Sequence, residues 1–300
     1  MNTFLISGCG DIGIRVARCL RQQAGVDSVI YGLVRREETA QILVAEKIKP
    51  VIADLDKPES LIVVPTKNAT IFHLAPPPND NQDEHKTRDP RFRALLKSCE
   101  SNGLPEKIIL LSTTAVYGDC DGEWIDESAE VNPQTDRGRR RLDAELALQE
   151  WANTRKIPFV IIRVSGIYGP GRLPIERLKK GLPILSEDLS PFSNRIHQDD
   201  LAAICVAAAQ RAPNGSVYNA CDGHPSTMSH YFKSIAKALN LPMPPELDRE
   251  QAEKQLSAGM LSYLRESRRM DNKKVLQDLK ISLQYPDLES GLKNISIENV

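Results

Sequence analysis

Apolar residues gather in short runs that predict the strands of a sheet. The runs cover residues 3–7, 28–34, 50–53, 69–74, 107–112 and 158–164. Most of them are separated by stretches of helical periodicity, such as Ile14, Ala17 and Leu20 on one face of the first predicted helix. This alternation predicts βαβ units and a mostly parallel sheet. The continuous apolar run over residues 108–111 is typical of a central strand covered on both faces.

The pattern changes after about residue 165, where shorter elements are interrupted by Pro170, Pro174, Pro183 and Pro191. Helices are expected over residues 199–211, 227–240 and 271–279, with a strand near residues 216–220. We therefore expect an α/β fold with a Rossmann-type, doubly wound parallel sheet in residues 1–165. Residues 166–300 are predicted to form a smaller, mixed α/β C-terminal region that is interleaved with the first.

A glycine pattern directly follows the first predicted strand. Gly8, Gly10 and Gly13 form a Gly-x-Gly-x-x-Gly run that opens the first helix, with Asp11 and Ile12 between the last two glycines. Glycines allow a tight turn there and let a pyrophosphate approach backbone N–H groups at a helix N-terminus. Between a strand and a helix, this run predicts a dinucleotide site, although glycines alone would indicate only a tight turn.

The composition is typical of an ordinary globular protein. The 300 residues are 41% hydrophobic and carry a formal net charge of −1, which argues against a nucleic-acid partner. No apolar stretch approaches the roughly 18 residues of a membrane span, and the start does not resemble a secretion signal. The six cysteines lack Cys-x-x-Cys spacing, so neither a zinc site nor a disulfide framework is indicated. We expect reduced thiols, a cytoplasmic location, no membrane contact and no bound metal.

Five stretches resemble one family in the order in which they occur. Besides the glycine run, they are residues 53–55, 111–118, 163–172 and 194–201. Together they resemble the extended short-chain dehydrogenase/reductases, the nucleotide-sugar epimerase/dehydratase family, over nearly the whole chain. The resemblance implies a dinucleotide-binding domain in residues 1–165, a substrate-binding region in residues 166–300, and a monomer or homodimer that binds a small-molecule substrate. The glycine run departs from the family's usual Gly-x-x-Gly-x-x-Gly.

The residues at the family's usual catalytic pair also differ. Members place Tyr-x-x-x-Lys on the helix after the fifth strand, whereas here Arg137 occupies the tyrosine position and Arg141 the lysine position. Arginine cannot exchange a proton as a phenol does, because its pKa lies above about 12. Arg141 can still donate to the nicotinamide ribose, and Arg137 can clamp a phosphate or carboxylate. The alternative for both is a basic face on a solvated helix.

Two hydroxyl groups are further candidates for the chemistry. Thr113 falls at the family's serine/threonine position, which contacts the reacting substrate oxygen, although a hydroxyl capping a strand end is the alternative. Tyr117 can offer its phenol to the same cleft, or it can be a buried aromatic with its hydroxyl satisfied. Arg172, in the loop that follows, is a candidate for a substrate contact.

The end of the second predicted strand should select the cofactor. Arg35 and Arg36 follow this strand, and two adjacent cations favour the 2′-phosphate of NADP. NAD stays possible, because Glu37 and Glu38 come next and can neutralise the arginines or bind a ribose.

The resemblance implies further cofactor contacts. Asp54 and Leu55 would contact the adenine, while a turn cap is the alternative for Asp54. Leu74, Ala75 and Pro76 would pass the nicotinamide side of the cofactor.

Taken together, the residues favour an NAD(P)-binding, epimerase/dehydratase-like oxidoreductase of an atypical subgroup that lacks Tyr-x-x-x-Lys. Its substrate would be a sugar-nucleotide or another small carbonyl or hydroxyl compound. The alternative is a catalytically silent, NADP-binding regulatory or interaction protein, which Arg137 at the tyrosine position favours. A third hypothesis is a nucleotide-sugar binder that uses Arg137 and Arg172 on phosphates.

Overall fold

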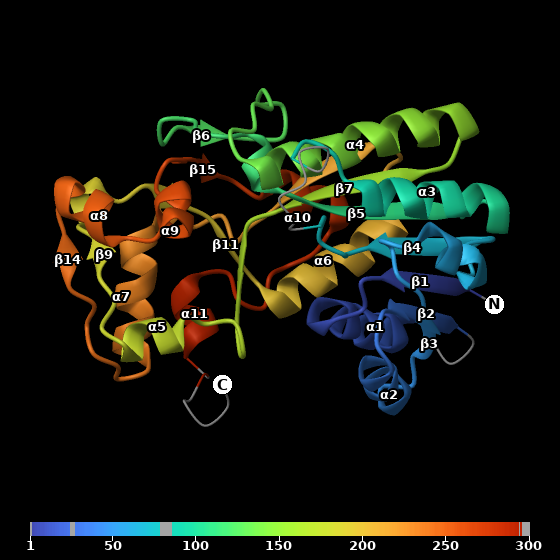
Figure 1. Cartoon of the computed structure of the whole chain (residues 1–300), viewed down its shortest axis with the longest axis horizontal. Helices are drawn as coiled ribbons and strands as arrows, with labels where there is room; N and C mark the ends of the chain where they lie inside the picture. Colours follow the sequence, from blue (N-terminus) through green and yellow to red (C-terminus); the bar gives the residue numbers. More distant parts are fainter. Residues whose placement is uncertain (1, 25–27, 79–85, 294, 296–300) are drawn as a thin grey trace.

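The computed structural model describes residues 2–24, 28–78, 86–293 and 295. In this part of the chain, seven parallel strands form one sheet in the order β12-β7-β5-β4-β1-β2-β3 (Figure 1). The strands are β1 (Thr3–Ser7), β2 (Val29–Val34), β3 (Lys49–Ile52), β4 (Ala69–His73), β5 (Lys107–Thr113), β7 (Phe159–Val164) and β12 (Ser216–Ala220). The predicted Rossmann-type sheet is thus confirmed. The strand order reverses between β1 and β4, and ligands of open α/β sheets bind at such a point.

Helices cover both faces of the sheet. One face carries α1 (Asp11–Ala24), α2 (Glu37–Ala45), α6 (Gln198–Arg211) and α10 (Lys273–Leu279); the other carries η1 (Pro58–Val63), α3 (Pro90–Asn102) and α4 (Asp136–Arg155). Ile109 and Leu111 of β5 pack on the first face, whereas Ile108 and Leu110 pack on the second. This double coverage explains why the central strands are apolar at consecutive positions.

The last strand of the sheet comes from the second half of the chain. β12 pairs in parallel with β7, with Ser216 opposite Val160 and Ala220 opposite Val164. Tyr218 and Ala220 bury their side chains in the same core as α6. The sheet therefore contains residues from both sides of position 165. The boundary predicted there between a dinucleotide-binding domain and a substrate-binding region stays a prediction.

Shorter elements, most of them from the C-terminal half and two from the segment after β5, lie beside one end of the sheet (Figure 1). They are η3 (Thr114–Val116), β6 (Trp124–Ile125), β8 (Gly166–Tyr168), α5 (Ile175–Lys179), β9 (Ile184–Leu185), η4 (Glu187–Leu189), β10 (Phe192–Ser193), β11 (Arg195–His197), β13 (Ser226–Thr227), α7 (Met228–Ala238), β14 (Glu246–Leu247), α8 (Arg249–Gln255), α9 (Ala258–Tyr263), β15 (Arg269–Met270) and α11 (Leu288–Leu292). Tyr231, Phe232 and Ile235 of α7 form a separate apolar cluster with Leu178 and Leu292.

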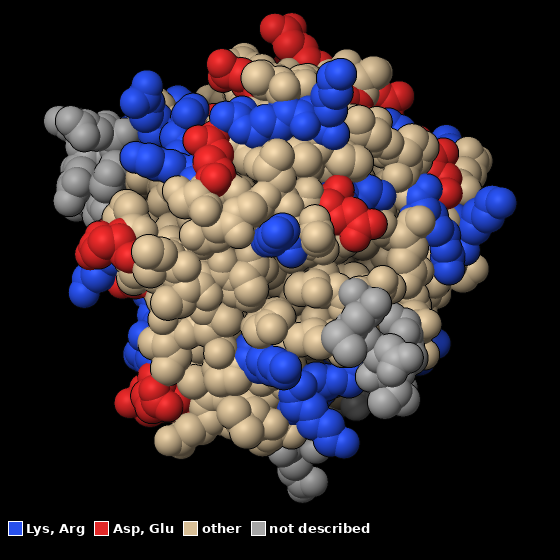
Figure 2. Space-filling model, turned by 90° about the vertical axis from the view of Figure 1, so that its right-hand side faces the viewer, with Lys and Arg blue, Asp and Glu red and all other residues tan. Residues whose placement is uncertain are grey.

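The surface carries charges of both signs. Figure 2 shows the face on the right of Figure 1, where basic and acidic side chains are dispersed among uncharged residues. No helix in the described ranges combines the length and the apolar composition of a membrane span.

Candidate functional site

A cavity of about 290 Å³ lies beside the glycine turn. Its wall includes eight of the residues predicted to bind the cofactor, namely Gly8, Gly10, Arg35, Arg36, Asp54, Leu55, Ala75 and Pro76. These residues follow β1, β2, β3 and β4, so four separate stretches of sequence converge at the carboxyl edge of the sheet. This is the edge at which parallel α/β sheets bind ligands.

The three glycines of the turn are required for different reasons. Gly8 has a φ of +85°, and a Cβ there would lie 2.5 Å from the Ala75 nitrogen. A Cβ at Gly13 would lie 3.0 Å from a methyl carbon of Ile6, so Gly13 lets α1 pack closely on β1. A Cβ at Gly10 would meet nothing within 4 Å. The space over Gly10, next to the N-terminus of α1, therefore fits a dinucleotide pyrophosphate.

Asp11 and Ile12 lie at the start of α1 but do not line this cavity. The side chain of Ile12 belongs to the core, so only its backbone is available at the turn. The Asp11 carboxylate accepts from Arg15 Nε at 3.1 Å and from Arg172 Nε at 2.9 Å. Arg15 also pairs with Asp199, the second residue of α6.

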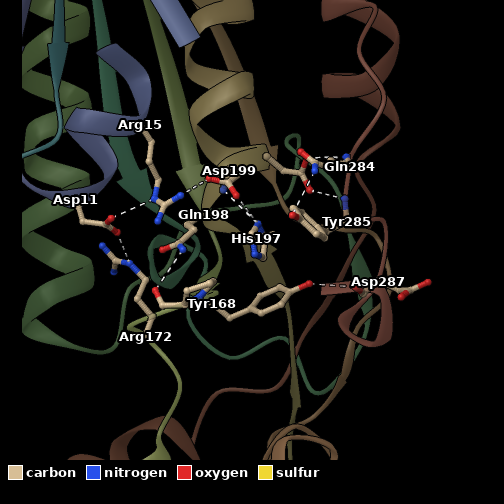
Figure 3. Close-up of polar contacts among 12 residues, drawn as sticks. Asp11, Arg15, Tyr168, Arg172, His197, Gln198, Asp199, Gln284, Tyr285 and Asp287 are labelled. Atoms are coloured by element: carbon tan, nitrogen blue, oxygen red, sulfur yellow. Dashed lines mark hydrogen bonds and ion pairs between the residues drawn. The ribbon is translucent and has the colours of Figure 1, made fainter. Parts of the chain in front are cut away.

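Arg172 thus contacts Asp11, next to the glycine turn, and does not line the cavity beyond β5. In Figure 3, the side chains of Arg15 and Arg172 both point toward the Asp11 carboxylate. The loop that carries Arg172 is held by Gln198 Nε2, which donates to the Pro170 carbonyl at 3.2 Å. The structure therefore corrects the sequence-based expectation for Arg172, because the loop after β8 directs this side chain toward α1.

A third arginine, which the sequence analysis missed, joins Arg35 and Arg36 at the cavity. Arg91, near the start of α3, donates to both carboxylate oxygens of Asp56 at 2.7 and 2.6 Å and to the Pro76 carbonyl at 3.0 Å. Arg35 Nη1 lies 3.9 Å from the same Asp56 carboxylate. No local motif marks Arg91, because only the packing of α3 brings it to this edge.

Asp54 and Leu55 line the cavity, and their side chains also make contacts within the protein. Asp54 Oδ1 accepts from the backbone N–H of Asp56 at 3.0 Å, which is the turn cap considered from the sequence. Leu55 is buried in the core on the α3 side of the sheet. Their contact with adenine stays a prediction.

Arg141 is held against the turn that follows β4. The N–H groups of Leu74 and Ala75 both donate to the Ser7 carbonyl, at 2.8 and 3.1 Å. Arg141 Nη2 donates to the Ala75 carbonyl at 2.9 Å, and Nη1 lies 3.5 Å from Asp89 Oδ2. Burial lowers the pKa of Arg141, but its ordinary value is so high that the side chain stays charged. The solvated-face alternative is therefore wrong for this residue, which is 9% exposed.

A second cavity, of about 250 Å³, lies at the carboxyl ends of β5 and β7. Thr113 and Arg137 both line it. Thr113 and Arg137 share this cavity because α4 packs very close to η3. Gly138 of α4 allows this packing, since a Cβ there would lie 2.6 Å from the Ala115 carbonyl oxygen. Thr113 Oγ1 also accepts from the Ala115 N–H at 3.3 Å. The capping role and the cavity position considered for Thr113 therefore coexist.

Tyr117 does not line either cavity. It is 1% exposed, and its hydroxyl donates to Asn219 Oδ1 at 2.8 Å. The Arg163 guanidinium lies 4.8 Å from its ring centre, and burial raises the pKa of the phenol. The structure thus corrects the expectation of a phenol in the cleft, because η3 turns the chain and packs Tyr117 among Val116, Cys221 and Met270.

Residues far along the chain complete the second cavity. They are Phe192, Ser193, Asn194, Arg195, Met228, Glu266 and Arg268. None of them was predicted to be a site residue: Asn194 and Arg195 lie in the stretch 194–201 that resembles the family, and the others lie on short segments that match no motif. In the described ranges, no group of three or more His, Cys, Asp or Glu residues is placed to hold a metal ion.

Comparisons with known proteins agree with this geometry. The sequence pattern of the NAD dependent epimerase/dehydratase family matches residues 4–221. Protein YeeZ of Escherichia coli (strain K12) is 28% identical over 195 residues, which cover 64% of this chain and 63% of that protein. D-erythronate dehydrogenase of Cupriavidus necator is 26% identical over 218 residues, covering 69% and 64%. The matches thus span less than two thirds of either curated relative.

A solved structure covers nearly the whole chain. It is that of a functionally unknown conserved protein from Silicibacter pomeroyi DSS, which is 30% identical with a TM-score of 0.81. The superposition covers 98% of this chain and 97% of the other. The similarity therefore extends over both cavities and the C-terminal half.

Proposed function

The chain belongs to the NAD dependent epimerase/dehydratase family, and we propose from this that it is an NAD(P)-dependent oxidoreductase acting on a small hydroxyl or carbonyl substrate. The observation that carries the proposal is the space over Gly10 in a cavity lined by residues from the ends of four strands. The second cavity, with Thr113, lies at the same edge of the sheet. One edge thus offers room for a dinucleotide and for a substrate.

Each residue group has a defined task in this proposal. The turn at Gly10 would hold the pyrophosphate, and Arg141 would donate to the nicotinamide ribose. A bound nicotinamide supplies hydride transfer. Thr113 would hydrogen-bond the substrate oxygen, while Arg137 would attract an anionic group of the substrate, since it cannot exchange a proton. Free thiols at all six cysteines support a cytoplasmic location.

We propose NADP rather than NAD as the preferred cofactor. Arg35, Arg36 and Arg91 bring three guanidinium groups to the cavity, and charge-assisted hydrogen bonds to a 2′-phosphate contribute about 1.5–3 kcal/mol. We expect NADPH to bind about 10- to 150-fold more tightly than NADH, which is that free energy expressed as an affinity ratio. Fluorescence titration of both cofactors measures this ratio.

The double variant Arg35→Ala, Arg36→Ala should lose most of this preference. A matched control is Arg18→Ala, since Arg18 on α1 pairs with Glu46 at the end of α2 and does not line the cavity. Equal affinities for the two cofactors in the wild-type protein, or an unchanged preference in the double variant, would overturn the choice of NADP.

Arg172 is expected to support cofactor binding indirectly. Without the Arg172 guanidinium, less of the negative charge of Asp11 would be neutralised. This charge lies beside the proposed pyrophosphate site and would repel the phosphates. An exposed ion pair contributes about 0.2–1 kcal/mol, so Arg172→Ala should weaken NADPH binding by roughly 1.4- to 5-fold. Titration of Arg172→Ala, Asp11→Asn and the double variant tests the coupling. The loss should vanish when Asp11 is already Asn; an equal loss in both backgrounds would show that Arg172 acts by another route.

Substrate turnover distinguishes the proposed enzyme from the alternative, an NADP-binding regulatory or interaction protein. That alternative is favoured by Arg137 at the position where the family usually has a tyrosine. NADPH absorbance can be followed with a panel of nucleotide sugars, hydroxy acids and carbonyl compounds. Hydride transfer with any of them supports the enzyme. Tight NADPH binding without turnover across the panel would support the regulatory protein, and failure to bind NADPH or NADH would overturn both.

A further inference from the structure

Asp56 contacts two of the three arginines that line the cavity beside the glycine turn. Arg91 donates to both of its carboxylate oxygens, at 2.7 and 2.6 Å, and Arg35 Nη1 lies 3.9 Å from Oδ2. Asp56 does not line the cavity itself. Its carboxylate can therefore act on a ligand in the cavity through its charge and through these two arginines.

Hydrogen bonds on both sides fix this contact. The backbone N–H of Asp56 donates to Asp54 Oδ1 at 3.0 Å, in the turn that follows β3. Ser60 Oγ holds the same turn, because it donates to the Asp54 carbonyl at 3.0 Å and accepts from the Asp54 N–H at 2.9 Å. Arg91 also donates to the Pro76 carbonyl at 3.0 Å. The pair of Asp56 and Arg91 thus joins the segment after β3 to the segment after β4.

Among the carboxylates near Arg91, Asp56 has the largest influence. Hydrogen bonds with Asp56 raise the pKa of Arg91 most strongly, and burial opposes them. The charge of Asp56 adds to the increase, ahead of the charges of Asp89 and Asp54. Asp89 lies instead against Arg141, 3.5 Å from its Nη1. The negative charge that faces Arg91 is therefore mainly that of Asp56.

This charge opposes a second anion at the same arginines. Anions on two edges of one guanidinium lie about 6 Å apart, because each N–H···O contact is about 2.8 Å long. At that distance in water, the repulsion between two single charges weakens binding about threefold. A phosphate with nearly two charges is weakened about tenfold. NADH has no 2′-phosphate, so this repulsion acts on NADPH alone.

We propose that Asp56 sets the strength of the cofactor preference, because its carboxylate competes with the 2′-phosphate of NADP for Arg35 and Arg91. This inference rests on the proposed function, since it concerns the cofactor chosen by the same cavity. It gives a specificity-determining role to a residue that the sequence analysis did not select.

Fluorescence titration of the full chain with NADPH and with NADH tests the proposal. In Asp56→Asn, the ratio of the NADPH affinity to the NADH affinity should rise about 3- to 10-fold over the wild-type ratio at about pH 8, where the phosphate carries nearly two charges. Asparagine is close to aspartate in shape and keeps one oxygen that can accept from Arg91. Raising the salt from about 0.1 M to about 1 M should reduce the gain to less than about twofold, because the Debye length falls from about 10 to about 3 Å.

A second background separates the charge of Asp56 from its effect on the position of Arg91. Arg91→Ala removes the arginine to which Asp56 donates no proton but offers both oxygens, so the carboxylate is then less neutralised. Asp56→Asn added to Arg91→Ala should raise the affinity ratio by about threefold or more. If Asp56 served only to orient Arg91, the added substitution would leave the ratio unchanged, and the proposal would be wrong.

Glu46→Gln is the matched control. Glu46 also accepts from one arginine, Arg18, through both carboxylate oxygens, and it does not line the cavity. This variant should keep the wild-type affinity ratio.

The outcomes distinguish this inference from the proposed function. A wild-type protein that prefers NADPH, together with an unchanged or lower ratio in Asp56→Asn, would overturn the role of Asp56 alone. An equal gain for NADH and NADPH would do the same, since the charge would then not act on the 2′-phosphate. Equal affinities of the wild-type protein for both cofactors would instead overturn the choice of NADP.

Discussion

Gly10→Val is expected to lower dinucleotide affinity by about 100-fold or more, equivalent to about 2.7 kcal/mol, in a protein that stays folded. The backbone of Gly10 is outside the left-handed region, and a Cβ there meets nothing within 4 Å. The valine side chain would therefore extend into the cavity and occupy the space of the pyrophosphate without disturbing the protein. Circular dichroism reports the fold, and calorimetric titration with NADPH reports the affinity.

Gly8 provides the matched comparison. At a φ of +85° and with a Cβ 2.5 Å from the Ala75 nitrogen, Gly8→Ala forces the β1 turn away from the chain after β4. This variant should lose stability as well as binding. A folded Gly10→Val protein that keeps wild-type affinity would show that the glycine run is merely a tight turn.

Glu145→Ala is expected to lower the free energy of unfolding by about 3–5 kcal/mol, because it leaves a buried arginine without its partner. Glu145 on α4 is 1% exposed and Arg163 on β7 is 7% exposed. Arg163 Nη2 lies 2.8 Å from Glu145 Oε2, and Ser112 Oγ donates to Oε1. The pair ties α4 to β5 and β7, next to the cavity that holds Thr113 and Arg137. Urea unfolding followed by circular dichroism measures the loss.

Two further variants define the origin of that loss. Glu150→Ala changes an exposed carboxylate on the same helix and should cost less than about 0.5 kcal/mol. The double variant Glu145→Leu, Arg163→Met should recover part of the stability, since no unpaired charge is then buried. A loss in Glu145→Ala no larger than in Glu150→Ala would mean that the pair does not stabilise the fold.

The sequence by itself determined the sheet and the glycine turn at its carboxyl edge. Strand and helix periodicity is local, so each βα unit could be predicted from consecutive residues. The turn at Gly10 was equally predictable, because one short segment contains the strand end, the glycines and the helix start. In parallel sheets the carboxyl ends of the strands share one edge, and this geometry brings Arg35, Asp54 and Ala75 to the same cavity.

Only the tertiary structure decided which side chains face the cavities. Tyr117 is buried, Arg172 pairs with Asp11, and Arg91 lines the cavity beside the glycine turn. Glu266 and Arg268 come from a segment with no recognisable pattern, yet they line the second cavity with Arg137. The physical reason is that side-chain direction and burial depend on packing between segments distant in sequence, whereas periodicity reports only the element to which a residue belongs.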